Sequence, residues 1–237
     1  MPGLEIIVPV HNEEETIALT FLRLKKEIRH RNRVTIVNDH CDDDSLERLK
    51  LLDAARENTE LVSNDDRRGF ANALRRGIKN VCGEEDAVVF VMADGCDDVS
   101  DINRMLELVK NGYDVVCASR FLPGGKREGG DTLKRMLSSF GNRILTILFP
   151  GRFTDWTNSF KIYRKRVLDE IKPRSSGFEI SLELALKVSG GDYSIKEIPT
   201  VWRERDKGVS KFGFKDGCGY LRWVLFALAL RLGLKKA

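Results

Sequence analysis

Short apolar runs alternate with amphipathic segments along the first half of the chain, and this alternation constrains the fold more than any other feature. The runs have the length and β-branched content of buried strands, and they cover residues 4–10, 34–37, 60–63, 87–92 and 114–118. The segments between them have the apolar spacing of helices, and they cover residues 14–29, 46–56, 69–79 and 101–110. Strands that alternate with helices predict an α/β fold, in which a mostly parallel, doubly wound sheet carries helices on both faces.

Polar and acidic residues follow three of these strands, at residues 11–14, 38–45 and 93–98. In a doubly wound sheet, ligands bind in the crevice at the carboxyl ends of the strands. Acidic turns are often only solvated helix caps, but carboxylates crowded at one edge repel each other unless a positive or hydrogen-bonding group compensates. Carboxylate oxygens suit Mg²⁺ or Mn²⁺, which can neutralise a diphosphate leaving group. We therefore expect a ligand site at this edge.

The alternation weakens after residue 120. Residues 123–130 contain four glycines and three charged residues, which predicts a mobile loop. Further helices are expected at residues 133–149 and 178–188, and further strands at residues 160–163 and 193–201. No internal repeat or low-complexity linker interrupts the chain, so a single domain is expected.

The C-terminal segment is unusually apolar. Residues 223–230 are all apolar, and Arg222 and Arg231 flank them. This run is too short to span a bilayer, but Trp223 and the flanking basic residues are typical of a helix that lies in a membrane interface. A helix packed on the core or in a dimer is the alternative. We therefore divide the chain into residues 1–214 and an apolar C-terminal helix, residues 215–237.

Composition excludes several classes of protein. Hydrophobic residues make up 42% of the 237 residues and charged residues 32%, as in folded globular proteins. The net charge of +4 is too small to indicate a nucleic-acid partner. Five cysteines without a Cys-x-x-Cys pair argue against a zinc site or a disulfide framework. We expect a cytoplasmic protein without a signal peptide or a membrane-spanning helix.

Several short motifs follow one another in a characteristic order. Pro9, Asn12 and Glu13 form a Pro-x-x-Asn-Glu segment, an acidic turn runs over residues 38–45, and an Ala-Asp-Gly segment contains Asp94. Later motifs continue to Lys211. In order and spacing, the chain resembles glycosyltransferase family two with the A-type nucleotide-diphospho-sugar fold, and within it the dolichyl-phosphate mannose synthase branch. The resemblance implies that residues 1–214 form the catalytic domain.

The resemblance assigns donor and metal residues. The donor pocket would contain Pro9, Val10, Asn12, Glu13, Asp39, Arg68, Gly69, Ala93 and Ser210. Asp39 would accept a hydrogen bond from the base. Asp94 would bind Mg²⁺ or Mn²⁺, and Asp97 or Asp98 would complete the metal site, because Met92 stands where the family has a first aspartate.

The resemblance also assigns an acceptor site and catalytic residues. An acceptor phosphate would be held by Arg120, Lys134, Arg135, Ser138, Ser139 and Asn142, although this helix face could also be only a solvated basic surface. Phe178 and Glu183 would lie in a helix beneath the acceptor. A basic loop with Arg205, Ser210 and Lys211 would close over the diphosphate. The expected catalytic residues are Asp94, Arg120, Asp155, Arg205 and Lys211.

The implied activity is that of a metal-dependent, inverting hexosyltransferase. It would move mannose or glucose from a nucleotide-diphospho-sugar to a polyprenyl phosphate of the dolichyl type, on the cytoplasmic face of a membrane. Asp155 would orient the sugar. In a second interpretation the acceptor is a saccharide or protein hydroxyl, and Asp155 or Glu183 is the general base. In a third, the chain binds nucleotide sugars without catalysis, for which Met92 is the main support. A membrane surface and self-association are further expectations.

Overall fold

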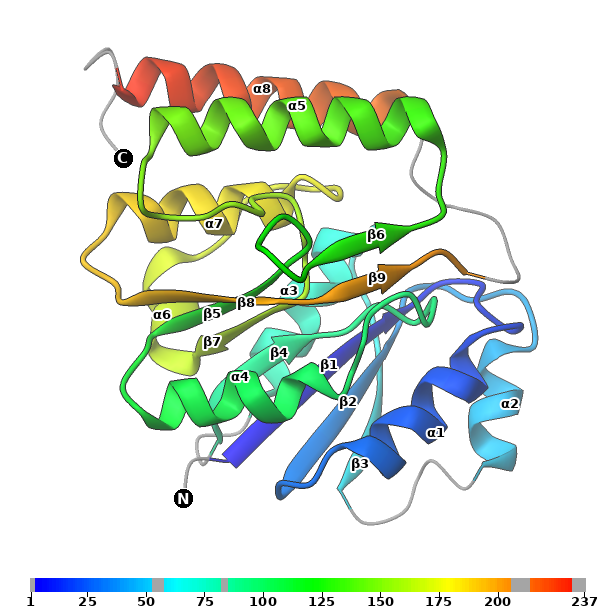
Figure 1. Ribbon diagram of the computed structural model, residues 1–237. Coiled ribbons are helices and arrows are strands. Elements are labelled where there is room, and N and C mark those ends of the chain that lie inside the picture. The colour runs from blue at the N-terminus through cyan, green and yellow to red at the C-terminus, as the bar shows by residue number, and fades with distance from the viewer. Residues whose placement is uncertain (1–2, 53–57, 82–84, 206–213, 232–237) are drawn as a thin grey trace.

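The computed structural model describes residues 3–52, 58–81, 85–205 and 214–231 and has an α/β architecture (Figure 1). Its central sheet has the strand order β3-β2-β1-β4-β7-β5-β8. These strands are β1 Gly3–Val10, β2 Asn32–Asn38, β3 Thr59–Ser63, β4 Glu85–Phe90, β5 Val115–Ser119, β7 Lys161–Arg164 and β8 Ile195–Pro199. Only β7 runs antiparallel to its neighbours in this sheet. The predicted mostly parallel α/β sheet is therefore confirmed.

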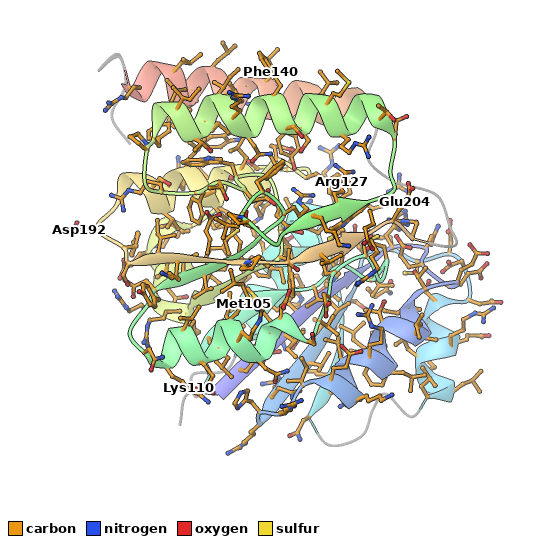
Figure 2. All side chains as sticks on the ribbon, in the orientation of Figure 1. Met105, Lys110, Arg127, Phe140, Asp192 and Glu204 are labelled. Carbon is orange, nitrogen blue, oxygen red and sulfur yellow. The ribbon has the colours of Figure 1, made fainter. Side chains whose placement is uncertain are left out.

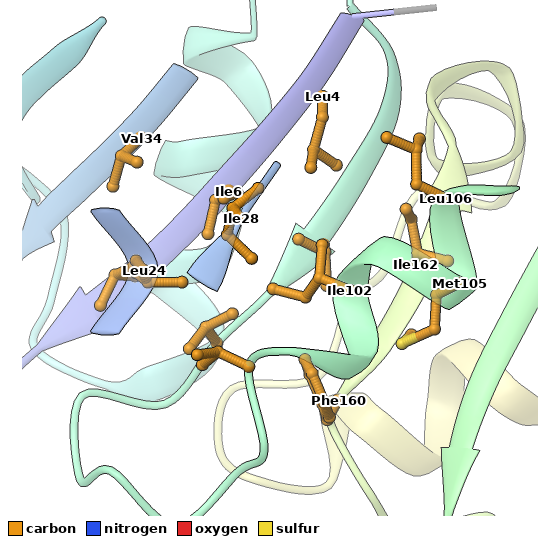
Figure 3. Packing of buried hydrophobic residues seen from close by; sticks show 14 of the residues in the cluster. Leu4, Ile6, Leu24, Ile28, Val34, Ile102, Met105, Leu106, Phe160 and Ile162 are labelled. Carbon is orange, nitrogen blue, oxygen red and sulfur yellow. The ribbon is translucent and has the colours of Figure 1, made fainter. Parts of the chain in front are cut away.

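Helices cover both faces of the sheet. One face carries α1 Ile17–Glu27, α2 Ser45–Leu51 and α4 Asp101–Lys110. The opposite face carries α3 Phe70–Asn80, α6 Lys165–Ile171 and α7 Ile180–Gly190. Neighbouring residues of β1 point to opposite faces, so Ile6 packs in the first core, shown in Figure 3, and Ile7 in the second. Because both faces are buried, β1 is apolar at nearly every position.

Two long helices form an outer layer over α7. α5 Thr132–Leu148 and α8 Phe214–Arg231 lie side by side in this layer (Figure 1). Ala227 of α8 is fully buried, and the indole Nε1 of Trp223 donates to Ser175 Oγ at 2.9 Å. The predicted C-terminal helix therefore packs on the rest of the chain, while Leu221 and Leu225 remain exposed. The proposed division between residues 214 and 215 falls in its first turn and stays a prediction.

No helix in the described part of the chain combines the length and the apolar character needed to cross a bilayer.

Residues 123–130, expected to form a mobile loop, instead contain a short strand. β6 Lys126–Glu128 pairs in parallel with β9 Val201–Arg203 and forms a second, two-stranded sheet. The glycine content of residues 123–130 favours a loop, but pairing with β9, which is distant in the sequence, orders the backbone of β6. The loop prediction was wrong for this reason.

Residues 193–201 were expected to form one strand and are divided between β8 and β9. Pro199, the last residue of β8, has no N–H to continue a ladder. Thr200 then bridges the two sheets: its N–H donates to Ser119 O at 3.0 Å, and its carbonyl accepts from Lys126 N at 3.0 Å. The second sheet is therefore fixed directly to the carboxyl end of β5.

Candidate active site

A pocket of about 420 Å³ opens where β1, β2 and β4 end. Seven of the predicted donor residues line it: Pro9, Val10, Glu13, Asp39, Arg68, Gly69 and Ala93. His11, Phe70, Met92 and Phe178 complete the lining. The cavity thus lies at the edge that the sequence indicates, while the contacts of each residue with a donor stay predictions.

Asn12 is absent from this lining. It adopts a positive φ of 51°, and its side chain faces the acidic turn after β2. Its amide nitrogen donates to Asp42, and its amide oxygen accepts from Asp42 N at 3.0 Å. Asn12 was expected in the donor pocket. Its amide nitrogen and oxygen instead both bond to Asp42 and link the segment after β1 to the turn after β2.

Hydrogen bonds also compensate the negative charge of the acidic turn. Asp43 accepts from Glu14 N at 3.1 Å and from Ser45 N at 3.0 Å, and Ser45 Oγ accepts from Glu13 N at 2.8 Å. Burial alone would raise the pKa of Asp43, but these bonds outweigh it and lower the pKa. These hydrogen bonds therefore tie the turn after β2 to the segment that follows β1.

Asp39 shapes the floor of the pocket. Its carboxylate, buried at 4% exposure, accepts from Gly69 N at 2.9 and 3.1 Å and from Asn64 Nδ2 at 2.7 Å. Gly69 has a φ of 150°, and a Cβ there would lie 3.1 Å from Ser176 O. Asp39 therefore fixes the glycine turn that begins α3. A carboxylate has four lone-pair sites, so it keeps acceptor capacity toward the pocket.

Phe178 lines the same pocket as the predicted donor residues. Its ring stacks on Phe70 with 4.9 Å between centroids and an interplanar angle of 18°. The sequence places Phe178 only in a helix beneath the acceptor, because its position depends on a contact between segments more than 100 residues apart. This aromatic wall was missed, and no local pattern predicts it.

Arg205 joins the ends of β1 and β4. Its guanidinium lies 2.7 Å from Asp94 Oδ2 and 3.2 Å from Glu13 Oε2, and all three side chains are nearly buried. Burial would lower the pKa of Arg205, but the charges of Asp94 and Glu13 outweigh burial and raise it. The predicted basic loop therefore meets the predicted donor carboxylates. Ser210 and Lys211, predicted on the same loop, lie outside the described residues.

Asp97 is the member of this carboxylate group with the least complete set of partners among the described residues. Its side chain is 5% exposed, and Oδ2 has no hydrogen-bond partner among the described residues. Burial, and then the charge of Asp94, raises the pKa of Asp97 to about 7. Asp98 differs, because its Oδ1 accepts from Ser100 Oγ at 2.7 Å and its Oδ2 lies 3.8 Å from Arg203. Of the two expected second ligands, Asp97 is the one that keeps a carboxylate oxygen without a hydrogen-bond partner in the described part of the chain.

Asp94 and Asp97 could supply only some of the ligands that a Mg²⁺ or Mn²⁺ ion needs. Within the described ranges, no three His, Cys, Asp or Glu side chains cluster closely enough to hold a metal ion. Mg²⁺ is commonly held by one or two carboxylates, with waters and substrate phosphates in the remaining positions. The orphaned oxygen of Asp97 beside Asp94 fits that pattern. A metal would therefore be bound together with the donor diphosphate.

A buried ion pair closes the end of β5. Arg120 Nε lies 2.7 Å and Nη2 2.9 Å from the two carboxylate oxygens of Asp155, which is 0% exposed. Burial would raise the pKa of Asp155, but the charge of Arg120 and its hydrogen bonds lower it. A general base has to reach a substrate proton. The enclosed carboxylate of Asp155 instead positions Arg120.

The ion pair is connected to α5 through Thr157. Thr157 Oγ1 lies 3.4 Å from Arg120 Nη2, 3.0 Å from Asn142 Nδ2 and 3.5 Å from Ser138 Oγ. Ser138 therefore belongs to the same network as Arg120.

Ser139 and Arg135, two further predicted acceptor residues, form no side-chain hydrogen bond with this network among the described residues. Ser139 Oγ donates to its own helix, at Arg135 O (2.9 Å), and the Arg135 side chain is exposed. Lys134 lies in α5, but its side chain is outside the described part of the structure.

Glu183, the other candidate base, is also enclosed. It is 0% exposed and accepts from Arg174 N at 2.8 Å and Ser175 N at 2.6 Å, and Lys187 Nζ lies 2.7 Å away. These contacts fasten the segment before α7. Glu183 thus supports the loop that carries Phe178.

Comparison with known proteins identifies the family. The family model described as glycosyl transferase family 2 matches residues 5–172, more than half of the chain. The chain belongs to this family, as its motifs predict.

The most similar relatives include two prenyl-phosphate enzymes. A dolichol-phosphate mannosyltransferase from Pyrococcus furiosus is 27% identical over 93% of this chain, which spans 62% of that relative. An undecaprenyl-phosphate mannosyltransferase from Micrococcus luteus is 28% identical over 96% of this chain and 98% of its own length. The chain thus covers less than two thirds of the first relative and nearly all of the second.

Solved structures share the fold. Glucosyl-3-phosphoglycerate synthase from Mycobacterium tuberculosis, solved with Mn²⁺, uridine diphosphate and phosphoglyceric acid, superposes with a TM-score of 0.70 at 16% identity. The match covers 100% of this chain and 80% of that protein. This likeness confirms the predicted fold class.

Replacing Asp97 by asparagine should stabilise the metal-free protein, and the gain should grow with pH. The folded-state pKa of about 7 exceeds the ordinary 3.8, so stability is lost as the pH rises from about 4 through about 7. Asparagine removes the charge that burial opposes. Melting temperatures of the native protein and Asp97→Asn, measured in EDTA at pH 4 and pH 8, test this, and the difference should appear mainly at pH 8.

Asp65 provides the control, because its side chain is 74% exposed. Asp65→Asn should give no gain at pH 8. A variant at Asp97 that is equally destabilised at both pH values would contradict the account.

Proposed function

We propose that this chain transfers a hexose, mannose or glucose, from a nucleotide-diphospho-sugar to a polyprenyl phosphate, with inversion at the anomeric carbon. The observation that carries the proposal is the meeting of Arg205 with Glu13 and Asp94 at the mouth of a 420 Å³ pocket. A family 2 chain with this arrangement can bind a nucleoside and its diphosphate at adjacent places. The names of the Pyrococcus and Micrococcus relatives support a prenyl phosphate as acceptor and mannose as the sugar.

On the donor side, the base would lie against the Phe70–Phe178 wall and donate a hydrogen bond to Asp39. Asp94 and Asp97 would hold Mg²⁺ or Mn²⁺, which supplies Lewis-acid neutralisation of the diphosphate when it is bound. Arg205, drawn away from its two carboxylates, would neutralise the same diphosphate together with Ser210 and Lys211.

On the acceptor side, Arg120 and Arg135, with Lys134, Ser138 and Ser139, would hold the lipid phosphate. A phosphate oxygen attacks the anomeric carbon from the face opposite the leaving group. The bond between that carbon and the diphosphate oxygen breaks, and the nucleoside diphosphate leaves with the electron pair. The phosphate is already anionic at neutral pH, so the step needs no general base, and positioning and charge stabilisation supply the catalysis.

The interpretation with a hydroxyl acceptor has weaker support. A hydroxyl needs a general base within reach. Asp155 and Glu183, the two candidates, are each 0% exposed and already accept several hydrogen bonds.

Asp94→Asn should lower metal-dependent transfer at least about 100-fold, the usual cost of removing one charge-stabilising group. The assay combines purified protein, Mn²⁺ or Mg²⁺, a panel of nucleotide sugars, and farnesyl phosphate as a short polyprenyl phosphate. Release of nucleoside diphosphate is measured with and without the lipid phosphate. The native protein should release it only with metal and lipid phosphate together.

Asp169→Asn is the matched control, because Asp169 lies on α6 with its side chain 53% exposed and should leave transfer unchanged. Full activity of Asp94→Asn would overturn the metal assignment. Donor binding by the native protein without any lipid-stimulated release would overturn transfer to a prenyl phosphate and favour a binding protein.

We also propose that the outer face of α5 and α8 rests on the cytoplasmic face of a membrane. Six large apolar side chains on these helices are between 57% and 71% exposed: Met136, Leu137, Phe140, Ile147, Leu221 and Leu225. Exposed arginines accompany them on the same helices, including Arg143 and Arg222. Figure 2 shows Phe140 on the side of α5 that faces away from the sheet. Apolar side chains flanked by basic ones are typical of interfacial helices.

Replacing Leu137 and Phe140 together by serine should weaken binding to anionic vesicles at least about tenfold, because each apolar side chain contributes about 1.5–3 kcal/mol when buried. Cosedimentation with phosphatidylglycerol–phosphatidylcholine vesicles measures this.

Leu51→Ser is the control for general loss of surface hydrophobicity, since Leu51 of α2 is 86% exposed and far from α5 in Figure 1. Absence of vesicle binding by the native protein would contradict the membrane proposal. A dimer that dissociates when Leu137 and Phe140 are replaced would assign this face to self-association instead.

A further inference from the structure

The short sheet of β6 and β9 holds an arginine that the sequence motifs do not include. Arg127 and Trp202 are direct partners in the β6–β9 register, and the guanidinium of Arg127 lies 4.5 Å from the centroid of the Trp202 ring. Gly130 covers another side of it: a Cβ on Gly130 would lie 3.3 Å from Nη2 of Arg127. The guanidinium is therefore fixed between an aromatic ring and a glycine backbone.

Among the described residues, this guanidinium has no anionic partner. Nε of Arg127 is buried and has no hydrogen-bond partner there, and Arg127 forms no ion pair with a carboxylate of these residues. The carboxylates in its surroundings are otherwise engaged: Asp155 binds Arg120, and Glu204 accepts from Gly130 N at 2.6 Å. A buried donor without an acceptor costs roughly 1–3 kcal/mol. An ordered arginine in this state is ready to bind an anion.

The surroundings indicate which anion. Burial and then the positive charge of Arg120, with a smaller contribution from Arg135, lower the pKa of Arg127 and outweigh the opposite effect of Asp155 and Glu204. Two further guanidiniums therefore lie near enough to act on this one. In Figure 2, Arg127 lies between the β6–β9 pair and α5. On its outer side α5 carries the exposed apolar residues Leu137 and Phe140. Positive charges on the inner side of α5, together with apolar side chains on its outer side, suit a phosphate monoester with an apolar tail that passes this helix.

We infer that Arg127 is a further acceptor-binding residue, whose Nε and Nη groups hold two oxygens of the phosphate head group of a prenyl phosphate. The inference rests on the proposed function and adds to it a residue outside the recognised motifs. Guanidinium binds phosphate through two parallel N–H groups, which an ammonium cannot reproduce. Trp202 and Gly130 hold this fork in place before the ligand arrives.

The experiment measures binding by titration calorimetry, without transfer. The ligands are farnesyl phosphate, phosphoglyceric acid and inorganic phosphate, and a nucleoside diphosphate with Mn²⁺ serves as the donor-side probe. Arg127→Gln should weaken binding of farnesyl phosphate about 10- to 100-fold, the effect of losing a hydrogen bond between charged groups. It should leave binding of the nucleoside diphosphate within about twofold, which also shows that the variant is folded.

Two variants sharpen the test. Lys126→Gln removes the neighbouring positive charge of β6, which is exposed and paired with Glu128, and should leave farnesyl phosphate binding unchanged. Arg127→Lys keeps the charge without the fork and should restore only part of the affinity.

Farnesyl phosphate affinity equal to that of the native protein in Arg127→Gln would overturn the role of Arg127. Equal loss of farnesyl phosphate and nucleoside diphosphate would also overturn it, because the residue would then be structural. Native binding of phosphoglyceric acid as tight as that of farnesyl phosphate would overturn the lipid source. A native protein that binds nucleoside diphosphate but no phosphate ester would instead refute the proposed acceptor class, and the inference with it.

Discussion

Carboxylates crowded at one edge of the sheet are the constraint on which the rest of this site depends. Glu13, Asp39, Asp94 and Asp97 follow strands that end side by side, and like charges at such a distance repel. The fold compensates these charges differently: the backbone N–H of Gly69 and the side-chain amide of Asn64 donate to Asp39, and Arg205 spans Glu13 and Asp94. Asp97 is compensated least: its Oδ2 has no partner among the described residues, and its pKa stays raised despite the charge of Arg120. The ligand-free site is therefore electrostatically incomplete on the side where a cation and a diphosphate would enter.

A second arginine system serves the other side of the site. Arg120 is fixed by Asp155 and is connected through Thr157 to α5, so α5 and the end of β5 form one network. Family 2 chains need one place for a nucleotide sugar and another for its acceptor. Under the proposed function the two places would differ in chemistry, since one is rich in carboxylates with an aromatic wall and the other is rich in guanidiniums under α5, whose outer side is apolar.

The sequence predicts the donor edge well because that edge follows from local order. Polar residues directly after buried strands must meet where parallel strands end, and Pro9, Asp39 and Ala93 do so. Contacts between segments that are distant in the sequence could not be predicted from local order. Phe178 reaches the donor pocket from before α7, and Arg127 depends on the pairing of a glycine-rich segment with β9. The distinction between Asp97 and Asp98 also needed the structure, because it depends on side-chain orientation in a single turn.

The central claim is that the donor diphosphate completes the charge of this edge together with a divalent cation. Calorimetric titration of the native protein with guanosine and uridine diphosphates, in Mn²⁺ and then in EDTA, tests it most directly. The account predicts tight binding of one of the two nucleotides in Mn²⁺ and a loss of at least about tenfold in EDTA, because Asp94 and Asp97 would then repel the diphosphate. Equal affinity in Mn²⁺ and in EDTA would contradict it, since Arg205 and its loop would then suffice to bind the diphosphate.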